Sequence, residues 1–464
     1  MKILNGIASG MVMQRNLHNN MCDIHVQLSC VGEPRVSQGM LFSEKDGWYN
    51  LCGIPCGGPY TLILSDDVEE VTLEDVYVGD LWMLAGQSNM EGAGRMTEWE
   101  DSYEKAPETD VRAFYLDDHW DVAKAQLCEQ WKNADKAIAE YYIDIRKNSP
   151  WNEGIPSKPE RHGVCLGLSL GRTMKRYMGV PQGLIPCAFG GSCLEEWAPD
   201  NKEDRAFYPT LIRRFVACGG NARGLFWYQG EAEGHDDRVQ KFEKNMEELI
   251  AAIRRDTEKP YLPIVLFQIA ACSLPGCGTE SYGRNWSMIR EKQRTLPEHI
   301  KLLDVVATID LPRDDSIHLS AAAAHIAGYR GARAMYALCG GDVLPAPQID
   351  YITIEPDAVR YFWGNLIIRY KNLNGALVSN GNILGFSVAV DEKQAYTEPY
   401  RDVQSICLEG STVRVRTKLT CEQLKDAYLW YGAGLNCICT ITDSENMSIP
   451  AMGPVPIREY LRRE

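Results

Sequence analysis

The sequence predicts an α/β protein built on a parallel sheet, with one β-rich region before this core and another after it. Between about residues 78 and 340, short apolar runs alternate with segments that have the length and pattern of helices. This alternation is typical of parallel strands connected by helices that cover both faces of the sheet. The flanking regions instead carry short segments of β-forming residues separated by Gly and Pro turns.

The composition is that of a globular protein and excludes a disordered, fibrous or membrane-spanning chain. The 464 residues are 45% hydrophobic and 24% charged, and the net charge is −15. The longest mostly apolar run, at 261–272, falls short of the ~20 residues that span a bilayer. An acidic chain also lacks the basic surface that binds nucleic acid or anionic lipid. We therefore predict no nucleic-acid partner and no membrane partner, while the sequence leaves a homo-oligomer open.

The cysteines and the first residues predict a cytoplasmic protein without a metal site. None of the 16 cysteines stands in a C-x2-C pair, and none has histidine partners at zinc-ligand spacing. The first residues, MKILNGIASGMVMQR, contain no apolar run of signal-peptide length. Many thiols and no export signal are typical of a reducing compartment.

Three regions follow one another along the chain. Residues 1–77 are predicted as an N-terminal β domain, with strands in segments such as CDIHVQLSC and PYTLILSDD. Residues 78–344 are predicted as the α/β core, and 345–464 as a C-terminal β-rich domain. Within the core, 94–163 is too long, polar and aromatic for a single crossover, so we predict a partly helical insertion there.

Strands and helices alternate within the predicted core. The core strands are predicted at 78–85, 184–189, 224–229, 262–270 and 302–309. Helices are predicted near 164–178, 208–218, 236–255, 285–296 and 320–338. The last helix has a candidate N-cap in Ser320 and glycines just beyond its end. Strands of the C-terminal region are predicted at 366–370, 385–390, 412–417 and 427–431.

Polar residues follow four of the core strands at the point where each strand ends. Ser88 follows the first strand and Gly191 the second, while Gln229 stands at the end of the third. Asp315 and His318 follow the fifth, directly before a helix. Because ligands bind beyond the carboxyl ends of parallel strands, we expect these residues to converge at one edge of the sheet.

Together these residues are the parts of serine-based acyl transfer. Ser88, exposed on a tight turn, would be the nucleophile, and His318 would take its proton. Asp315, three residues before His318, would hold the imidazole in the required tautomer. The backbone N–H groups of Ser88 and Gly191 and the side-chain amide of Gln229 would stabilise the oxyanion of the tetrahedral intermediate.

Each residue also has a purely structural explanation. Ser88 could stand in an ordinary turn, and His318 could be a polar residue at a helix start. The glycines at 190–191 could serve packing or cradle a phosphate, but the sequence lacks both G-x-G-x-x-G and G-x4-G-K-[ST], so a nucleotide site has no support. The joint placement after four strands of one sheet favours the catalytic interpretation.

At these residues the sequence resembles the SGNH (GDSL-like) hydrolase superfamily, and within it the sialate O-acetylesterase and carbohydrate acetylesterase branch. The resemblance implies a flavodoxin-like three-layer core and removal of O-acetyl groups from sugars without metal or organic cofactor. The flanking regions also look like this branch, as in GMVMQR at 10–15. The motifs that carry the resemblance are VGDLWMLAGQSNMEG at 78–92, GLIPCAFGGSCLEEW at 183–197, GLFWYQGEAEG at 224–234 and DDSIHLS at 314–320.

The resemblance also implies a role for each motif residue. Ser88 matches the nucleophile and His318 the base, while Gly191 and Gln229 match the oxyanion hole, with Gln229 where other SGNH enzymes place Asn. Asp315 matches the usual acid, at a position that varies within this branch.

The expected substrate is an O-acetylated sugar, with O-acetylated sialic acid first among the candidates. Because sialic acid carries a carboxylate, Arg95 and Arg161 are the candidate cations that would bind it. Further substrate-binding candidates are Gln87, Asn89 and Glu231. The alternatives are an acetyl xylan esterase, an esterase for another acyl substrate, and a non-catalytic carbohydrate-binding protein.

Overall fold

The computed structural model describes residues 1–96, 107–128, 138–139, 163–201, 206–274 and 280–462. The chain divides into two compact units, which are described separately. The first unit contains Met1–Trp227, Glu248–Ile264 and Ser320–Ala332. The second contains Tyr228–Glu247, Val265–Leu319 and Arg333–Glu464.

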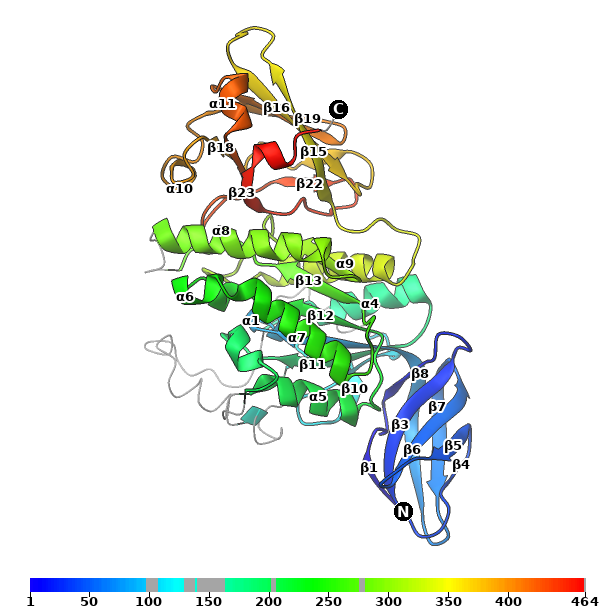
Figure 1. Cartoon of the computed structure of the whole chain (residues 1–464). Helices are drawn as coiled ribbons and strands as arrows, with labels where there is room; N and C mark the ends of the chain where they lie inside the picture. Colours follow the sequence, from blue (N-terminus) through cyan, green and yellow to red (C-terminus); the bar gives the residue numbers. More distant parts are fainter. Residues whose placement is uncertain (97–106, 129–137, 140–162, 202–205, 275–279, 463–464) are drawn as a thin grey trace. The chain divides into compact units, whose positions relative to one another are not determined.

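The N-terminal region of the first unit is a β structure, as predicted. Its four-stranded antiparallel sheet has the order β1 (Lys2–Asn5), β3 (Met21–Ser29), β6 (Trp48–Pro55) and β5 (Met40–Ser43). In β3 the buried residues Cys22, Ile24, Val26 and Leu28 alternate with more exposed ones. This period of two gives the sheet one apolar face toward the interior. The sheet is the blue region of Figure 1.

Strand β8 (Glu70–Gly86) connects this β region to the parallel sheet of the same unit (Figure 1). Its first half pairs antiparallel with β7 (Gly57–Ser65), and β2 (Val12–Gln14) pairs with it in parallel. Its second half pairs in parallel with β11 (Gln182–Ala188). Position 77/78 lies inside this strand, and the division into three domains stays a prediction.

A largely parallel and buried sheet, with the antiparallel β10 at its edge, forms the core of the first unit. The order is β10 (Trp120–Val122), β9 (Val111–Phe114), β11, β8 and β12 (Gly224–Tyr228). Helices α4 (Gly167–Met178) and α5 (Phe207–Ala217) pack on β11. The predicted α/β fold class with a parallel sheet is therefore confirmed.

The described part of the predicted insertion contains two strands as well as the helical residues 138–139. Strand β9 pairs in parallel with β11, and β10 pairs antiparallel with β9, so both strands extend the sheet. The side chains of β9 are all buried. Burial within the sheet, and not helix propensity, decides the structure of β9.

The second unit contains two further core strands and a long helix. Strands β13 (Ile264–Gln268) and β14 (Leu303–Ala307) are fully buried, as predicted for strands covered on both faces. The helix predicted at 285–296 is α8 (Glu280–Thr295). The helices predicted at 236–255 and 320–338 correspond to α6 (Asp236–Val239) with α7 (Phe242–Asp256), and to α9 (Ala321–Leu338). Residues 248–256 of α7 and 321–332 of α9 belong to the first unit. The Ser320 hydroxyl accepts a hydrogen bond from the Ala323 backbone N–H at 3.2 Å, which confirms the predicted N-cap of α9.

The C-terminal region of the second unit is antiparallel and shares one apolar core. Its largest sheet has the order β15 (Gln348–Pro356), β16 (Gly364–Lys371), β20 (Thr412–Thr417) and β19 (Val403–Glu409). A second has the order β18 (Phe386–Ala389), β21 (Tyr428–Tyr431) and β23 (Met452–Pro456), and β17 (Leu377–Ser379) pairs with β22 (Ile441–Asp443). Helix α8 packs against β23.

The remaining short elements of the described residues belong to both units. They are β4 (Arg35–Val36), α1 (Ser88–Glu91), α10 (Gln394–Thr397), α11 (Cys421–Lys425) and the 3-10 helices η3 (Leu194–Trp197), η4 (Glu231–Glu233), η5 (Leu296–Glu298) and η6 (Ile457–Glu459).

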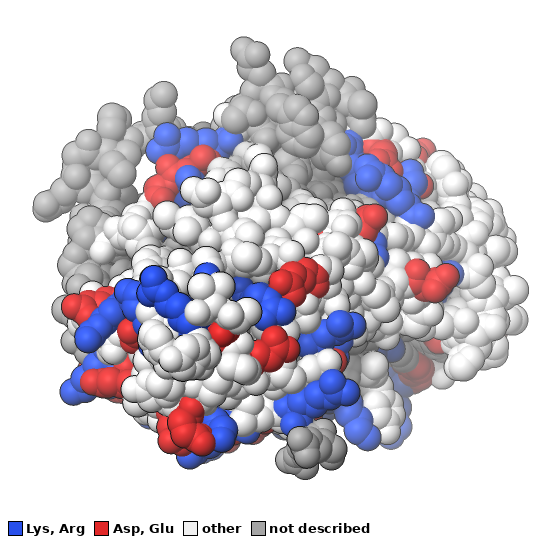
Figure 2. Space-filling view, turned by 90° about the horizontal axis from the view of Figure 1, so that it is seen from above, with Lys and Arg blue, Asp and Glu red and all other residues white. Residues whose placement is uncertain are grey.

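Charged side chains of both signs are mixed on the face seen in Figure 2, with uncharged surface between them. Among the described helices, none combines the length and the apolar composition that a membrane span requires. The fifteen cysteines that the structure describes are free thiols.

Candidate active site

Ser88 stands at the carboxyl end of β8, where the strand turns into the short helix α1. Gly86 before the turn has φ +134°, in the range that favours glycine. The neighbours Gln87, Asn89 and Glu91 are buried, whereas Ser88 keeps partial exposure. The turn therefore presents the hydroxyl of one residue and fixes its neighbours in the interior, as a nucleophile requires.

The glycines after β11 lie beside this turn. Gly86 of β8 pairs with Ala188 of β11, and Ser88 and Gly190 each follow two residues after this pair. A Cβ on Gly190 would lie 3.3 Å from the Ser88 Cβ and 2.6 Å from the Glu91 Oε2, so glycine is the residue that fits there. Gly191 is exposed and has φ +74°. The first unit thus brings the predicted nucleophile to the predicted oxyanion-hole loop.

Gln229 directly follows β12 and is fully buried in the second unit. Its side-chain amide donates a hydrogen bond to the Glu233 Oε1 at 2.8 Å, and its backbone carbonyl accepts one from the Gln293 Nε2 at 2.9 Å. An amide NH₂ has two donor hydrogens, so the bond to Glu233 orients the group and uses one of them. Sequence reasoning missed this function of Glu233, because a Glu in the EAE segment resembles a solvated side chain.

His318 and Asp315 form the predicted pair. The His318 Nδ1 lies 2.7 Å from the Asp315 Oδ2. The other carboxylate oxygen accepts the backbone N–H groups of Ile317 and His318 at 2.8 and 2.7 Å. Partial burial acts to raise the pKa of Asp315, but the hydrogen bonds from the His318 ring and from these two amides lower the pKa well below its usual value. The carboxylate therefore stays ionised at neutral pH.

The loop that carries His318 is held by three further hydrogen bonds. The Arg313 guanidinium donates to the Ser316 carbonyl at 2.7 Å and to the Asn436 Oδ1 at 3.0 Å. The Ser273 backbone N–H donates to the same Ser316 carbonyl at 2.7 Å. Sequence reasoning did not find this support, since Asn436 lies 123 residues from Arg313 along the chain.

The predicted site residues fall into two sets. The first unit brings together Ser88, Gly191 and the buried Gln87 and Asn89, and Arg95 is exposed in the same unit. The second unit holds the Asp315–His318 pair, Gln229, and Glu231, which is 4% exposed. Arg161 lies outside the described residues. The roles of these residues in catalysis and substrate binding, and the joining of the two sets in one site, stay predictions.

One group of side chains has metal-ligand chemistry within the described ranges. The carboxylates of Glu243 and Glu247 and the His299 imidazole have ligand atoms within 4.8 Å of one another. Lys292 lies 3.5 Å from Glu243, and its positive charge opposes a cation there. The group is partly to fully exposed, and exposed acidic groups of this kind are common without a metal.

The central part of the chain matches a known family of enzymes. The family described as "Carbohydrate esterase, sialic acid-specific acetylesterase" matches residues 78–337. A probable carbohydrate esterase of Arabidopsis thaliana is 27% identical over 261 residues, which are 52% of this chain and 84% of the plant protein. The sialate O-acetylesterase of Rattus norvegicus is 23% identical over 234 residues, which are 39% of this chain and 41% of the rat protein.

One solved structure is similar over almost the whole chain. A carbohydrate acetylesterase from Xanthomonas citri has a TM-score of 0.70 and 20% identity, covering 97% of this chain and 99% of that one. At this identity the likeness shows the fold, including the β-rich flanks, and not the activity.

Proposed function

The chain belongs to the carbohydrate esterase family described as sialic acid-specific acetylesterase, and on this basis we propose that it removes O-acetyl groups from sialic acid. The coarser assignment, a carbohydrate acetylesterase, follows from the family and from the relatives. The family match over residues 78–337 is the observation that carries it. The sialate substrate is the finer proposal, supported by the family description and by the rat sialate O-acetylesterase.

The proposed reaction is acyl transfer through an acetyl-enzyme. The Ser88 Oγ attacks the acetyl carbonyl carbon while the His318 Nε2 takes the hydroxyl proton. The C–O bond to the sugar then breaks, and His318 returns the proton to the departing sugar oxygen. Water, deprotonated by His318, attacks the acetyl carbonyl carbon. The bond to the Ser88 Oγ then breaks, His318 returns the proton to Oγ, and acetate is released.

Asp315 and the oxyanion donors have distinct functions in this proposal. The short contact of Asp315 with Nδ1 leaves Nε2 for the proton transfers, and its ionised carboxylate stabilises the imidazolium that forms. The oxyanion is stabilised by the backbone N–H groups of Ser88 and Gly191 and by the side-chain amide of Gln229. The bond to Glu233 keeps that amide in place before the oxyanion forms.

The carboxylate of sialic acid requires a cation, because the protein carries a net charge of −15. Arg95 is an exposed arginine four residues after Glu91, which ends α1. We propose that it binds this carboxylate, and Arg161 is the second candidate. Arg95→Met should raise KM for an acetylated sialic acid about ten-fold and leave KM for a neutral acetylated sugar unchanged. An equal effect on both substrates would contradict the assignment.

The test is acetate release from two substrates side by side, 9-O-acetylated sialic acid and acetylated xylo-oligosaccharide. Wild type should release acetate from the sialic acid, and Ser88→Ala should lose this activity while its circular dichroism and melting temperature stay those of wild type. Activity retained in Ser88→Ala would rule out the proposed nucleophile. Release from the xylo-oligosaccharide alone would keep the carbohydrate acetylesterase and replace the proposed sugar. A fluorophosphonate probe that labels wild type and not Ser88→Ala provides an independent readout of hydroxyl activation.

A further inference from the structure

A cavity of about 410 Å³ lies in the first unit, between the N-terminal β region and the start of the parallel sheet. One wall is the segment after β2, and the other walls are the residues before β12 and those that follow α7. Its volume falls in the range of small-molecule sites. The lining residues used below are Arg15, Asn16, Asn221, Arg223, Lys259 and Tyr261.

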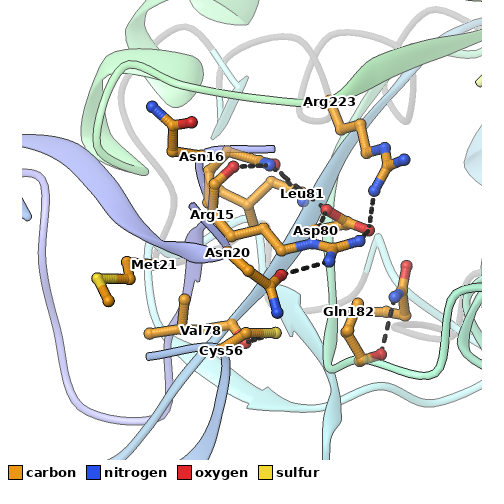
Figure 3. Close-up of polar contacts among 12 residues, drawn as sticks. Arg15, Asn16, Asn20, Met21, Cys56, Val78, Asp80, Leu81, Gln182 and Arg223 are labelled. Carbon is orange, nitrogen blue, oxygen red and sulfur yellow. Dashed lines mark hydrogen bonds and ion pairs between the residues drawn. The ribbon is translucent and has the colours of Figure 1, made fainter. Parts of the chain in front are cut away.

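Ion pairs hold the side chains at the base of this cavity. The Arg15 guanidinium binds both oxygens of the fully buried Asp80 at 2.9 Å, and Arg223 donates to the same carboxylate at 2.6 Å. Figure 3 shows the two arginines converging on Asp80. Arg15 also donates to the Asn20 Oδ1 at 2.6 Å. Arg15 and Arg223 thus share one buried carboxylate, while the carboxylates of Asp23 and Glu258 also line the cavity and offset its cations.

Lys259 adds a cation that no anion of the described residues pairs with. No hydrogen bond or ion pair of its ammonium group occurs within the described part of the chain, although the residue is only partly exposed. Burial lowers the pKa of Lys259, and the charge of Asp23 only partly opposes this. A partly buried ammonium without a hydrogen-bonded anion is unfavourable, and an anionic ligand would remove that penalty.

The remaining lining has the features of a sugar-binding surface. The ring of Tyr261 is 71% exposed, between Pro260 and Leu262. Asn16 and Asn221 contribute planar amides, and both are held by Asp23: the Asn16 side chain donates to its Oδ2 at 3.0 Å and the Asn221 side chain to its carbonyl at 2.8 Å. An exposed aromatic face beside pre-oriented amides fits the apolar face and the hydroxyl groups of a pyranose ring.

We propose that this cavity is an accessory site for an acidic sugar unit, whose carboxylate lies against Lys259 and whose ring packs on Tyr261. The choice of a sugar as ligand rests on the proposed function, while the choice of an anion rests on the Lys259 ammonium group, which pairs with no carboxylate of the described residues. Asp80 is eight residues before Ser88 along an extended strand, so the site lies roughly 25 Å from the candidate nucleophile. It therefore binds a different unit of a glycan from the one that is deacetylated, and raises the local concentration of the polymer.

The test is calorimetric titration of the full-length protein with a tetrasaccharide that contains glucuronic acid. This probe carries no acetyl group, so the esterase cannot hydrolyse it. Lys259→Met and Tyr261→Ala should each weaken binding about ten-fold or more. Lys45→Met, an exposed lysine of the same unit outside the cavity, should bind as wild type does. Xylotetraose, a neutral probe of the same length, should bind wild type at least ten-fold more weakly.

Hydrolysis of 4-nitrophenyl acetate separates this proposal from the proposed function. The Lys259 and Tyr261 variants should hydrolyse this small ester at the wild-type rate, because it does not extend to the cavity. Binding by Lys259→Met at the wild-type affinity would overturn the proposal, as would equal affinity for the acidic and the neutral tetrasaccharide or no binding at millimolar ligand. Loss of acetate release by Ser88→Ala, with tetrasaccharide binding unchanged, would support both proposals independently.

Discussion

Asp315 holds His318 at two points, through the imidazole ring and through the backbone. One carboxylate oxygen contacts Nδ1, and the other accepts two main-chain N–H groups of the same loop. The Asp315 side chain therefore contacts the imidazole ring and also stabilises the turn that carries His318. Replacing Asp315 changes the tautomer preference of the histidine and the conformation of its loop together.

Asp315→Asn separates these effects, since Asn retains an oxygen that accepts the backbone N–H groups. We expect kcat to fall about 10²-fold or more, because an amide does not stabilise the imidazolium. The pKa of Asp315 is lowered on folding, so its contribution to stability is present above the ordinary value of 3.8 and is lost as the pH falls through and below that value. The difference in free energy of unfolding between wild type and Asp315→Asn should therefore be constant from pH 8 to about 5 and shrink below about pH 4. Urea titrations over this range measure it, and a difference that grows on acidification would contradict the assignment.

Glu233 acts on the proposed chemistry through Gln229. Glu233→Ala removes the acceptor that orients the Gln229 amide, so kcat should fall about ten-fold with little change in KM. Gln229→Ala should lower kcat about 10²-fold, as expected for the loss of one oxyanion donor. In the double variant the two losses should not add, because both act on one hydrogen bond. Steady-state kinetics of the three variants test this, and additive losses would show that Glu233 acts separately.

Residue types and their spacing along the chain identify some of these groups and not others. The three-residue spacing of Asp315 and His318 predicted their contact, and the structure confirms the contact. Glu233 was missed because its burial depends on how η4 packs, which the sequence does not show. The contact of Arg313 with Asn436 depends on the register of two distant segments, and a single sequence carries no signal for it.

At the scale of the elements, one polar side chain of β13 connects this strand to its neighbours. The Gln268 Nε2 donates to the carbonyls of Arg290 and Ala451 at 2.8 Å, and its Oε1 accepts the Ala451 N–H at 2.8 Å. This fully buried glutamine thereby links β13 to α8 and to the residue before β23. It explains why the C-terminal region of the second unit is continuous with the core and is not a separate appendage.

Gln268→Leu keeps the approximate volume and removes all three hydrogen bonds. It leaves the Ala451 N–H and the carbonyl groups of Arg290 and Ala451 without these partners in the interior, so the free energy of unfolding should fall by roughly 2–4 kcal/mol. Gln268→Glu, which preserves an acceptor and no donor, should also destabilise the protein, and more at pH 8 than at pH 5 because the buried carboxylate then carries a charge. Chemical denaturation measures both variants. A loss below about 0.5 kcal/mol for Gln268→Leu would show that water replaces the lost bonds.

Strands inside continuous apolar runs were predictable, and the two strands of the polar segment 94–163 were not. The apolar runs at 224–229, 262–270 and 302–309 correspond to β12, β13 and β14, because burial on both faces requires continuous apolar sequence. Strands β9 and β10 contain only four and three residues and carry no such pattern. Their structure follows from the pairing of β9 with β11 and of β10 with β9, which is a tertiary effect.

At the scale of the whole molecule, the net charge of −15 acts on any charged substrate. Acidic and basic side chains are mixed on the face in Figure 2, so the surplus of negative charge is a diffuse property there and not a single patch. Such a diffuse field slows the approach of an anion even when a local cation binds it on contact. The proposed substrate, O-acetylated sialic acid, is an anion.

We therefore expect kcat/KM for O-acetylated sialic acid to rise about two-fold between low salt and 0.15 M salt, since the salt screens the repulsion. A neutral acetylated sugar should show no such increase. Initial rates at a series of NaCl concentrations, with Na₂SO₄ at equal ionic strength as the control for ion identity, measure the effect. A decrease with salt for the sialic acid would instead show that attraction by local cations dominates the encounter.

The seventeen-residue strand β8 limits where chimeric proteins between homologues can be joined. A single uninterrupted segment forms hydrogen bonds with the N-terminal hairpin along one half and with the parallel sheet along the other. No linker exists there at which one part is exchanged for another. Swapping the N-terminal region between homologues therefore also replaces the scaffold of the Ser88 turn, so chimeras joined inside β8 should inherit activity and thermal tolerance together.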